Sequence, residues 1–143
     1  MKYMYLALLS ASTAVAQISD NFSDGNFTEN PNWHGIQSHF EVDTLNQLHL
    51  NAPSENSSSY LSLRSQLLEN ATWEMSLKMD FNPSSSNYLD WYIIANDSLL
   101  ENCTEAYFVR IGNTEDEVAL YRQENDEIIK IIDGLDGRVN LNP

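Results

Sequence analysis

The fold is decided by a stretch near the end of the chain, YFVRIGNTEDEVALYRQENDEIIKII (residues 107–132). It holds three apolar segments separated by short polar runs rich in Asn, Asp and Glu, a composition typical of turns. We expect strands over Tyr107–Gly112, Val118–Arg122 and Ile128–Ile132, with turns at Asn113–Asp116 and Glu124–Glu127. Tight turns between successive strands predict a three-stranded meander.

The same two-residue period continues upstream. Tyr88–Ala95 is apolar on both faces except at Asp90, which predicts a central strand covered on both sides. It follows turn-forming residues at Asn82–Asn87. Before that turn, Trp73–Phe81 alternates strictly, and we expect a strand that buries one face. The side chains predicted to point into the core together are Trp73, Met75, Leu77, Met79 and Phe81.

The first half of the chain carries weaker signals. Phe40–Val42 and Leu48–Leu50 flank a polar loop and predict a hairpin, and Tyr60–Leu63 predicts one more short strand. Ser65–Asn70 is interpreted as a single helical turn. Many short strands without a long helix predict an all-β protein, built as an antiparallel β-sandwich or a barrel.

The two ends of the chain differ from this pattern. Residues 1–16 combine Lys2, an apolar run at Tyr3–Leu9 and small residues ending in Ala14-Val15-Ala16, which predicts a signal peptide. The alternative is a buried N-terminal strand or helix. Because the apolar run is far shorter than the ~20 residues of a membrane-spanning helix, we expect no membrane insertion. The product is predicted to be secreted or displayed at the cell surface.

The β-sandwich domain is assigned to residues 17–143. Arg138–Leu141 has the pattern of a further strand just before the final Pro143. We therefore expect the domain to be incomplete at its C-terminal end, with further domains of the same polypeptide downstream.

The charge of the chain excludes some partners. It has 7 Lys and Arg against 21 Asp and Glu, a formal net charge of −14. Such a surface repels nucleic acid phosphates and anionic membrane headgroups, so neither is expected as a partner. Cys103 is the single cysteine, so no disulfide can form within the chain.

Several segments, in this order, carry a resemblance to a known family: Asp20–Phe27, Asn30–Gly35, Phe40–Val42, Leu48–Ala52, Ser59–Ser62, Trp73-Glu74, Asp80–Tyr88, Tyr107–Gly112 and Ala119–Arg122. Together they resemble the N-terminal laminin-G/concanavalin A-like module of large secreted bacterial proteins. Those proteins often carry lamin-tail domains and a type IX secretion signal. The resemblance implies a jelly-roll-like β-sandwich. Asn21, Asn26 and Ile36 stand where the family often has Asp.

Catalysis is not expected from the residues present. The laminarinase-like hydrolases, which share the jelly roll, place acids as Glu-x-Asp-x-x-Glu on a strand. The nearest match is Glu41-Val42-Asp43-Thr44-Leu45-Asn46, where Asn46 replaces the third acid and cannot supply a proton. A glycoside hydrolase is therefore the alternative interpretation, and a purely structural spacer is the second alternative. The acids at Glu115–Glu117 are interpreted as a solvated hairpin tip.

The preferred interpretation is a noncatalytic extracellular module that binds a polysaccharide or extracellular matrix. Asp90 and Arg110 interrupt strands that otherwise look buried, so they either pair with each other or line a polar groove. Aromatic side chains beside such polar groups suit sugar binding. The predicted ligand-binding residues are Trp33, Asp90, Tyr92, Arg110 and Tyr121. Asp20 and Asp24 are the candidate ligands of a calcium ion.

Overall fold

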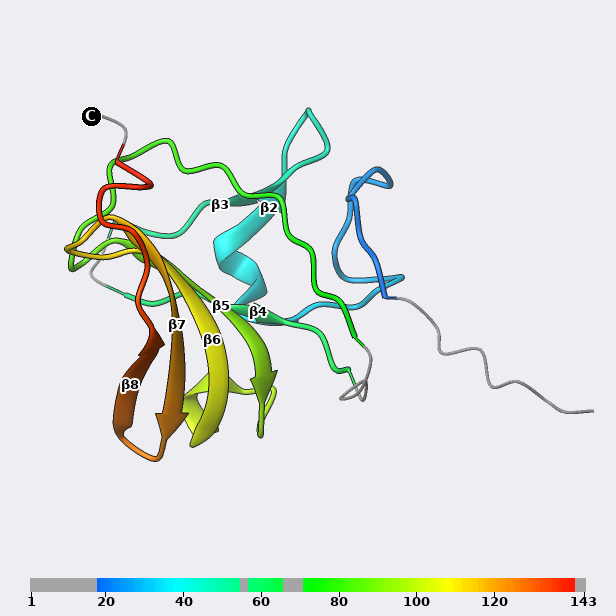
Figure 1. Ribbon diagram of the computed structural model, residues 1–143. Coiled ribbons are helices and arrows are strands. Elements are labelled where there is room, and N and C mark those ends of the chain that lie inside the picture. Colours follow the sequence, from blue (N-terminus) through cyan, green and yellow to red (C-terminus); the bar gives the residue numbers. More distant parts are fainter. Residues whose placement is uncertain (1–17, 55–56, 66–70, 141–143) are drawn as a thin grey trace, which may run out of the picture.

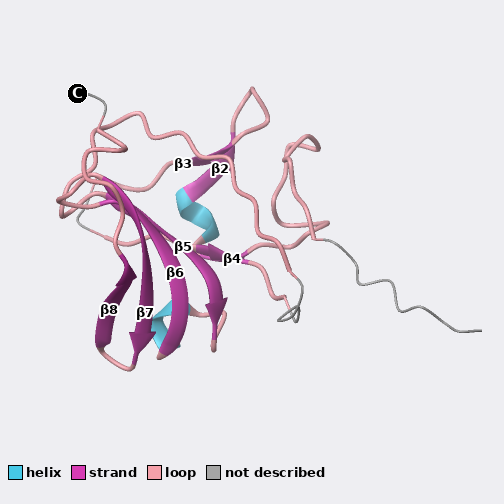
Figure 2. Cartoon of the chain, viewed as in Figure 1, coloured by secondary structure: helices cyan, strands magenta, loops and turns pink. Residues whose placement is uncertain are grey.

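The computed structural model describes residues 18–54, 57–65 and 71–140, and in them the protein is all-β and antiparallel. A four-stranded sheet dominates the molecule, and two two-stranded sheets lie beside it (Figure 1). Within the described ranges, helical structure is limited to two short 3₁₀ turns (Figure 2). The elements are β1 (His34–Gly35), η1 (Gln37–His39), β2 (Phe40–Val42), β3 (Leu48–Leu50), β4 (Leu61–Ser62), β5 (Tyr88–Ala95), η2 (Leu100–Asn102), β6 (Glu105–Gly112), β7 (Glu117–Glu124) and β8 (Glu127–Ile132).

The predicted meander is confirmed. The order of the large sheet is β5-β6-β7-β8, and each strand pairs with its successor along the chain. Asn113 and Asp116 adopt positive φ in the β6–β7 turn, and Asn125 does so in the β7–β8 turn. Asn and Asp tolerate this backbone region better than other residues with side chains, so the polar runs close the turns that the sequence predicts.

One face of the large sheet holds the core. Burial alternates along β6 and β7, and the buried hydrophobic side chains are Ala106, Phe108, Ala119 and Tyr121. Cys103, which follows η2, is also buried and belongs to the same cluster, and Leu100 packs against it. The apolar side chains of this face therefore form the centre of the molecule.

The small sheets confirm the predicted hairpin. β2 and β3 pair with Glu41 opposite His49, and β1 pairs with β4. Gly35 has a φ of +133°, and a Cβ at this position would collide with the carbonyl of Tyr60. Glycine is the residue that allows the two backbones to approach this closely. The predicted strand at Tyr60–Leu63 is present as the shorter β4.

The prediction for Trp73–Phe81 is wrong. Residues 73–79 belong to no strand, and the side chains of Trp73, Met75, Leu77 and Phe81 are exposed. Strict alternation shows which residues share a side of an extended chain. It does not supply the neighbouring backbone that a strand needs for its hydrogen bonds. None of the described strands pairs with this segment.

Two further predictions need correction. Tyr88–Ala95 forms β5 with the predicted bounds, but it is an edge strand among the described residues rather than a central one. Of the strand predicted at Arg138–Leu141, residues 138–140 are in turns or irregular backbone because the chain folds back. Gly137 N–H donates to the Glu115 carbonyl at 2.8 Å, and Val139 N–H donates to the Asp116 carbonyl at 2.9 Å.

Some predictions lie outside the described residues. They are the signal peptide at residues 1–16, most of the helical turn at Ser65–Asn70, and Leu141. Among the described helices, none has the length and apolar character needed to cross a membrane.

Candidate functional site

Four of the predicted ligand-binding residues come together on the core face of the large sheet. The strand register aligns Asp90 with Arg110, and in the next row it aligns Tyr92 with Phe108 and Tyr121. Side chains two residues apart on a strand lie on the same face, so the two rows are neighbours. β5 supplies Asp90 and Tyr92, β6 supplies Arg110, and β7 supplies Tyr121.

Asp90 and Arg110 form a two-pronged ion pair. Arg110 Nε donates to Asp90 Oδ1 at 2.7 Å, and Nη2 donates to Oδ2 at 2.8 Å. The side chain of Arg110 is 13% exposed and that of Asp90 is 18% exposed, so the pair lies at the boundary between core and solvent. The bond to Asp90 raises the pKa of the Arg110 guanidinium. Of the two alternatives that the sequence left open, mutual pairing is the one observed.

Aromatic rings surround the guanidinium. Its central carbon lies 4.2 Å from the centre of the Tyr88 ring, 5.0 Å from that of Tyr121 and 5.4 Å from that of Phe108. These distances are within the range of cation–π attraction. The arginine–aromatic cluster is defined here as Tyr88, Asp90, Tyr92, Phe108, Arg110 and Tyr121.

The cluster has a buried wall and an open rim. Phe108 stacks between Tyr92 and Tyr121, with centroid separations of 4.9 Å and 5.5 Å. Removal from water raises the pKa of Tyr92 to about 12, and the charge of Asp90 acts in the same direction. Tyr88, at the start of the edge strand β5, is exposed. A ligand would therefore meet Tyr88 first, with the Asp90–Arg110 pair beside it.

Sequence reasoning did not single out Phe108 for this cluster. The sequence did contain a signal for it: Phe108 lies two residues before Arg110 on the same strand, so both side chains lie on one face of the sheet. Tyr88 is likewise in phase with Asp90. The two-residue period does not show by itself which face is buried, so it did not assign Phe108 to a site, whereas Tyr88 was one of the aromatic residues considered for sugar binding.

Trp33 lies in a different contact group. Its indole Nε1–H donates to Asp20 Oδ2 at 2.8 Å, and its ring lies 6.1 Å from that of Phe22. The other oxygen of Asp20 accepts the Phe22 N–H at 2.8 Å. Trp33 is thus paired with one of the two residues predicted to bind calcium.

Asp24, the second predicted calcium ligand, acts within its own loop. Asp24 Oδ1 accepts the Asn26 N–H at 3.1 Å, which is a typical Asx turn. Calcium binding by Asp20 and Asp24 remains a prediction. The one group of three potential metal ligands in the described part of the chain lies elsewhere and consists of Glu115, Glu117 and Asp133.

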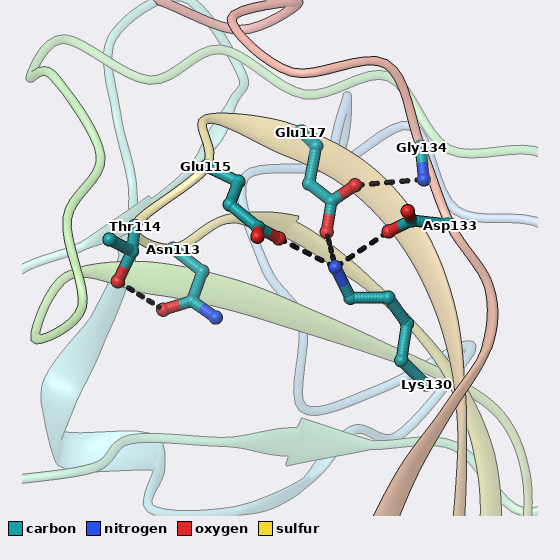
Figure 3. A network of polar contacts seen from close by, with 7 residues as sticks. All are labelled: Asn113, Thr114, Glu115, Glu117, Lys130, Asp133 and Gly134. Atoms are coloured by element: carbon teal, nitrogen blue, oxygen red, sulfur yellow. Dashed lines mark hydrogen bonds and ion pairs between the residues drawn. The ribbon is translucent and has the colours of Figure 1, made fainter.

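That group already surrounds a cation of the protein (Figure 3). Lys130 Nζ lies 2.6 Å from Glu115 Oε2, 2.5 Å from Glu117 Oε1 and 2.7 Å from Asp133 Oδ1. These bonds raise the pKa of Lys130, and the bond to Lys130 lowers the pKa of Asp133. The second oxygen of Glu117 accepts the Gly134 N–H at 2.8 Å.

The lysine cage, defined as Lys130, Glu115, Glu117 and Asp133, corrects one sequence interpretation. Glu115–Glu117 was expected to be a solvated hairpin tip, but Glu117 is buried. It is the paired Lys130 on the neighbouring strand that makes this burial tolerable, because an unpaired buried carboxylate is costly. The cage fastens the segment after β8 to the β6–β7 hairpin.

The residues nearest to a hydrolase motif have other roles. Glu41 Oε1 lies 3.5 Å from His49 Nδ1 across the β2–β3 hairpin. Asp43 Oδ1 accepts the N–H groups of Leu45 and Gln47 at 2.8 and 2.9 Å. Asp43 therefore shapes the hairpin turn.

Comparison with protein-family models, curated proteins and solved structures found no match to this chain.

Proposed function

We propose that this protein is a noncatalytic extracellular module that binds a glycan through the rim of the arginine–aromatic cluster. One observation carries the proposal: an exposed tyrosine ring, Tyr88, packs on a guanidinium that Asp90 holds in a fixed orientation. A flat apolar ring matches the C–H face of a sugar. The adjacent Asp and Arg offer an acceptor and donors for its hydroxyl groups.

Rigidity also supports binding at this place. Arg110 is held by two hydrogen bonds and faces three rings, so little side-chain freedom remains to be lost when a ligand binds. The core wall formed by Phe108 and Tyr121 supports the rim from below.

The proposal also includes a jelly-roll-like β-sandwich fold and a location outside the cell. The four-stranded sheet would be one layer of a jelly-roll-like β-sandwich, with the small sheets on its core side. Tyr60 O–H donates to Glu101 at 2.8 Å and Ser62 O–H donates to the Ser98 carbonyl at 2.9 Å, which ties β4 to the loop around η2. The resemblance to laminin-G/concanavalin A-like modules and the predicted signal peptide support a secreted or cell-surface protein with further domains.

A glycan array probed with the full chain tests the proposal, followed by calorimetric titration of any glycan that binds. Tyr88→Ala should weaken binding by at least about tenfold, as loss of a central aromatic contact typically does. Tyr88→Phe keeps the ring and should bind within about threefold of the unchanged protein, since a factor of three is under 1 kcal/mol. Absence of any bound glycan, or equal binding by Tyr88→Ala, would overturn the proposal.

The hydrolase alternative is tested separately by release of reducing sugar from β-glucans. We expect no release above the blank, because Asp43 is engaged in a turn and Asn46 replaces the third acid. Release that disappears in Glu41→Gln would establish catalysis instead.

A further inference from the structure

The cations on the core face of the large sheet are both neutralised by carboxylates. The described strands place two cations on this face, Arg110 on β6 and Lys130 on β8. Arg110 is held by both oxygens of Asp90, and Lys130 is held by the three carboxylates of the lysine cage (Figure 3). Neither cation is therefore available as a separate positive charge for a ligand.

The same face carries more negative than positive charge. Its two cations meet four carboxylates, those of Asp90 and of the three acids in the lysine cage. Glu117 lies two residues before Ala119, the direct partner of Arg110 across the strands, and such diagonal neighbours are ~7–8 Å apart. Salt screens charges incompletely at this separation. An anion brought to Arg110 would therefore be repelled by two carboxylates, and the whole chain carries a net charge of −14.

The guanidinium of Arg110 still has a hydrogen-bond donor to offer. Asp90 accepts from Nε and from Nη2. Nη1 has no hydrogen-bond partner in the described part of the chain and is not one of its fully buried polar atoms, so it reaches solvent. A neutral hydroxyl oxygen can accept from Nη1 without adding charge beside Asp90. A carboxylate or sulfate would bring a second negative charge to the same guanidinium, and like charges placed together oppose binding.

The loop that leads into Tyr88 carries no charge. Residues 82–87 have the sequence NPSSSN, and residues 85–87 are exposed. Pro83 fixes this loop at the rim, because it packs over Gly112, the direct partner of Tyr88 in the register. Exposed hydroxyl and amide groups beside an aromatic ring are suitable hydrogen-bond partners for an uncharged sugar.

We propose that the glycan site takes uncharged sugars and rejects uronic acids and sulfated sugars, and that Asp90 sets this selectivity. The inference rests on the proposed function, since it concerns the same rim. Asp90 neutralises the charge of Arg110 and fixes the guanidinium beside the Tyr88 ring, 4.2 Å from its centre. Tyr88 then supplies a flat apolar surface, and Nη1 of Arg110 supplies a donor, to a sugar without charge.

Calorimetric titration of the full chain with three forms of each oligosaccharide tests the selectivity. The probes are short glucan, mannan and galactan oligosaccharides with free primary hydroxyl groups, and any such glycan that the array identifies. Each is compared with the form in which the primary hydroxyl is oxidised to a carboxylate. The third form is the methyl ester of that carboxylate, which keeps the added group and removes its charge. We expect the carboxylate to bind at least about tenfold more weakly than the ester.

Asp90→Asn tests the role assigned to Asp90. The amide has nearly the same shape and keeps an acceptor for Arg110 Nε, but it gives up the negative charge, so the guanidinium becomes available to an anion. We expect this variant to bind the carboxylate form at least about tenfold more tightly than the unchanged protein does. The matched control is Glu105→Gln, which removes the same charge on the opposite face of the sheet and should show no such gain.

Salt dependence keeps the test decisive if Asp90→Asn fails to fold by circular dichroism. For the unchanged protein, the carboxylate form should bind more tightly as salt is added, because salt screens the repulsion by Asp90 and Glu117. Binding of the carboxylate that weakens with added salt would show that Arg110 attracts it, and this result would overturn the selectivity.

The outcomes separate this inference from the proposed function. If no glycan binds in any form, the proposed function fails and the inference fails with it. If a glycan binds and its carboxylate binds as tightly as its ester, glycan binding stands and the selectivity is wrong. A folded Asp90→Asn without a gain for the carboxylate, or an equal gain in Glu105→Gln, would show that Asp90 does not set the selectivity.

Discussion

At the scale of single residues, the large sheet depends on two polar contacts placed at the margins of an apolar core. The Asp90–Arg110 pair lies beside stacked rings, and the lysine cage joins β7 and β8 on the same face of the sheet. In each case a charge on one strand meets an opposite charge on its neighbour. Such pairs favour one strand register over its alternatives, since a slip of one residue would separate the partners.

Tyr92 makes the stability of the folded protein depend on pH in the alkaline range. Burial raises its pKa to about 12 from the ordinary value of 10.0, so the folded state holds the phenolic proton more tightly than the unfolded chain does. The resulting stabilisation is complete below pH 10 and is lost as the pH rises toward 12. Tyr92→Phe should therefore show a smaller fall in melting temperature over this interval. An equal fall in both proteins would contradict the assignment.

The lysine cage predicts unequal effects of its members. Lys130→Met leaves the buried carboxylate of Glu117 without its cation, and we expect a clear loss of melting temperature. Glu115→Gln removes a half-exposed carboxylate from the same cage and should melt close to the unchanged protein. Calorimetric melts of the two variants make the comparison. If both melt alike, the cage is not held together through Glu117.

Acid should weaken the same cage. The Lys130 ammonium holds the pKa of Asp133 below its ordinary value of 3.8. A carboxyl group whose pKa is lower in the folded state stabilises the protein at pH values above its pKa in the unfolded chain. That stabilisation disappears as the pH falls through its pKa in the folded state. Lys130→Met should therefore lose less stability below pH 3.8 than the unchanged protein, as followed by acid titration of the circular dichroism signal.

At the scale of elements, the sequence predicts the meander and the β2–β3 hairpin because their turns are encoded locally. Asn113, Asp116 and Asn125 occupy the positive-φ positions that the turns require. The Trp73–Phe81 segment lacked such information. Its alternation is as regular as that of any strand, but the partner of a strand is a distant part of the chain that a local pattern does not identify.

The same reasoning explains what could be predicted of the site. Asp90 and Arg110 were recognised as polar residues in apolar strands, and the β5–β6 register places them opposite each other. The separate position of Trp33 could not be predicted, because its contact with Asp20 belongs to a loop outside the sheets. Local patterns identified the polar residues of the sheet, whereas contacts between loops required the structure.

A glycine at the end of β6 couples the loop before β5 to the sheet. Gly112 has a φ of +101°, and a Cβ there would lie 2.5 Å from Pro83 Cβ. Gly112→Ala should destabilise the protein by about 2–3 kcal/mol, because backbone strain adds to the collision. Gly137 also has positive φ but open space around it, so Gly137→Ala should cost only about 1 kcal/mol. Urea denaturation of both variants measures the difference in the free energy of unfolding. Equal losses in the two variants would show that Pro83 moves aside without cost.

At the scale of the whole molecule, one sheet carries two different surfaces. The core face ends in the arginine–aromatic cluster, which we propose as a glycan site. The opposite face carries apolar rows over its middle and the carboxylates of Glu105, Glu124 and Glu127 at one end. Tyr88 lies on the core side of the sheet, at the rim of that cluster.

The affinity of two matched tyrosine variants for a short soluble glycan tests the central claim most directly. Tyr88 and Tyr107 are each 41% exposed, and they lie on opposite faces of the same sheet. We predict that Tyr88→Ala loses at least about tenfold in affinity, whereas Tyr107→Ala binds as the unchanged protein does. A loss confined to Tyr107→Ala, or an equal loss in both variants, would contradict the assignment of glycan binding to the rim of the arginine–aromatic cluster.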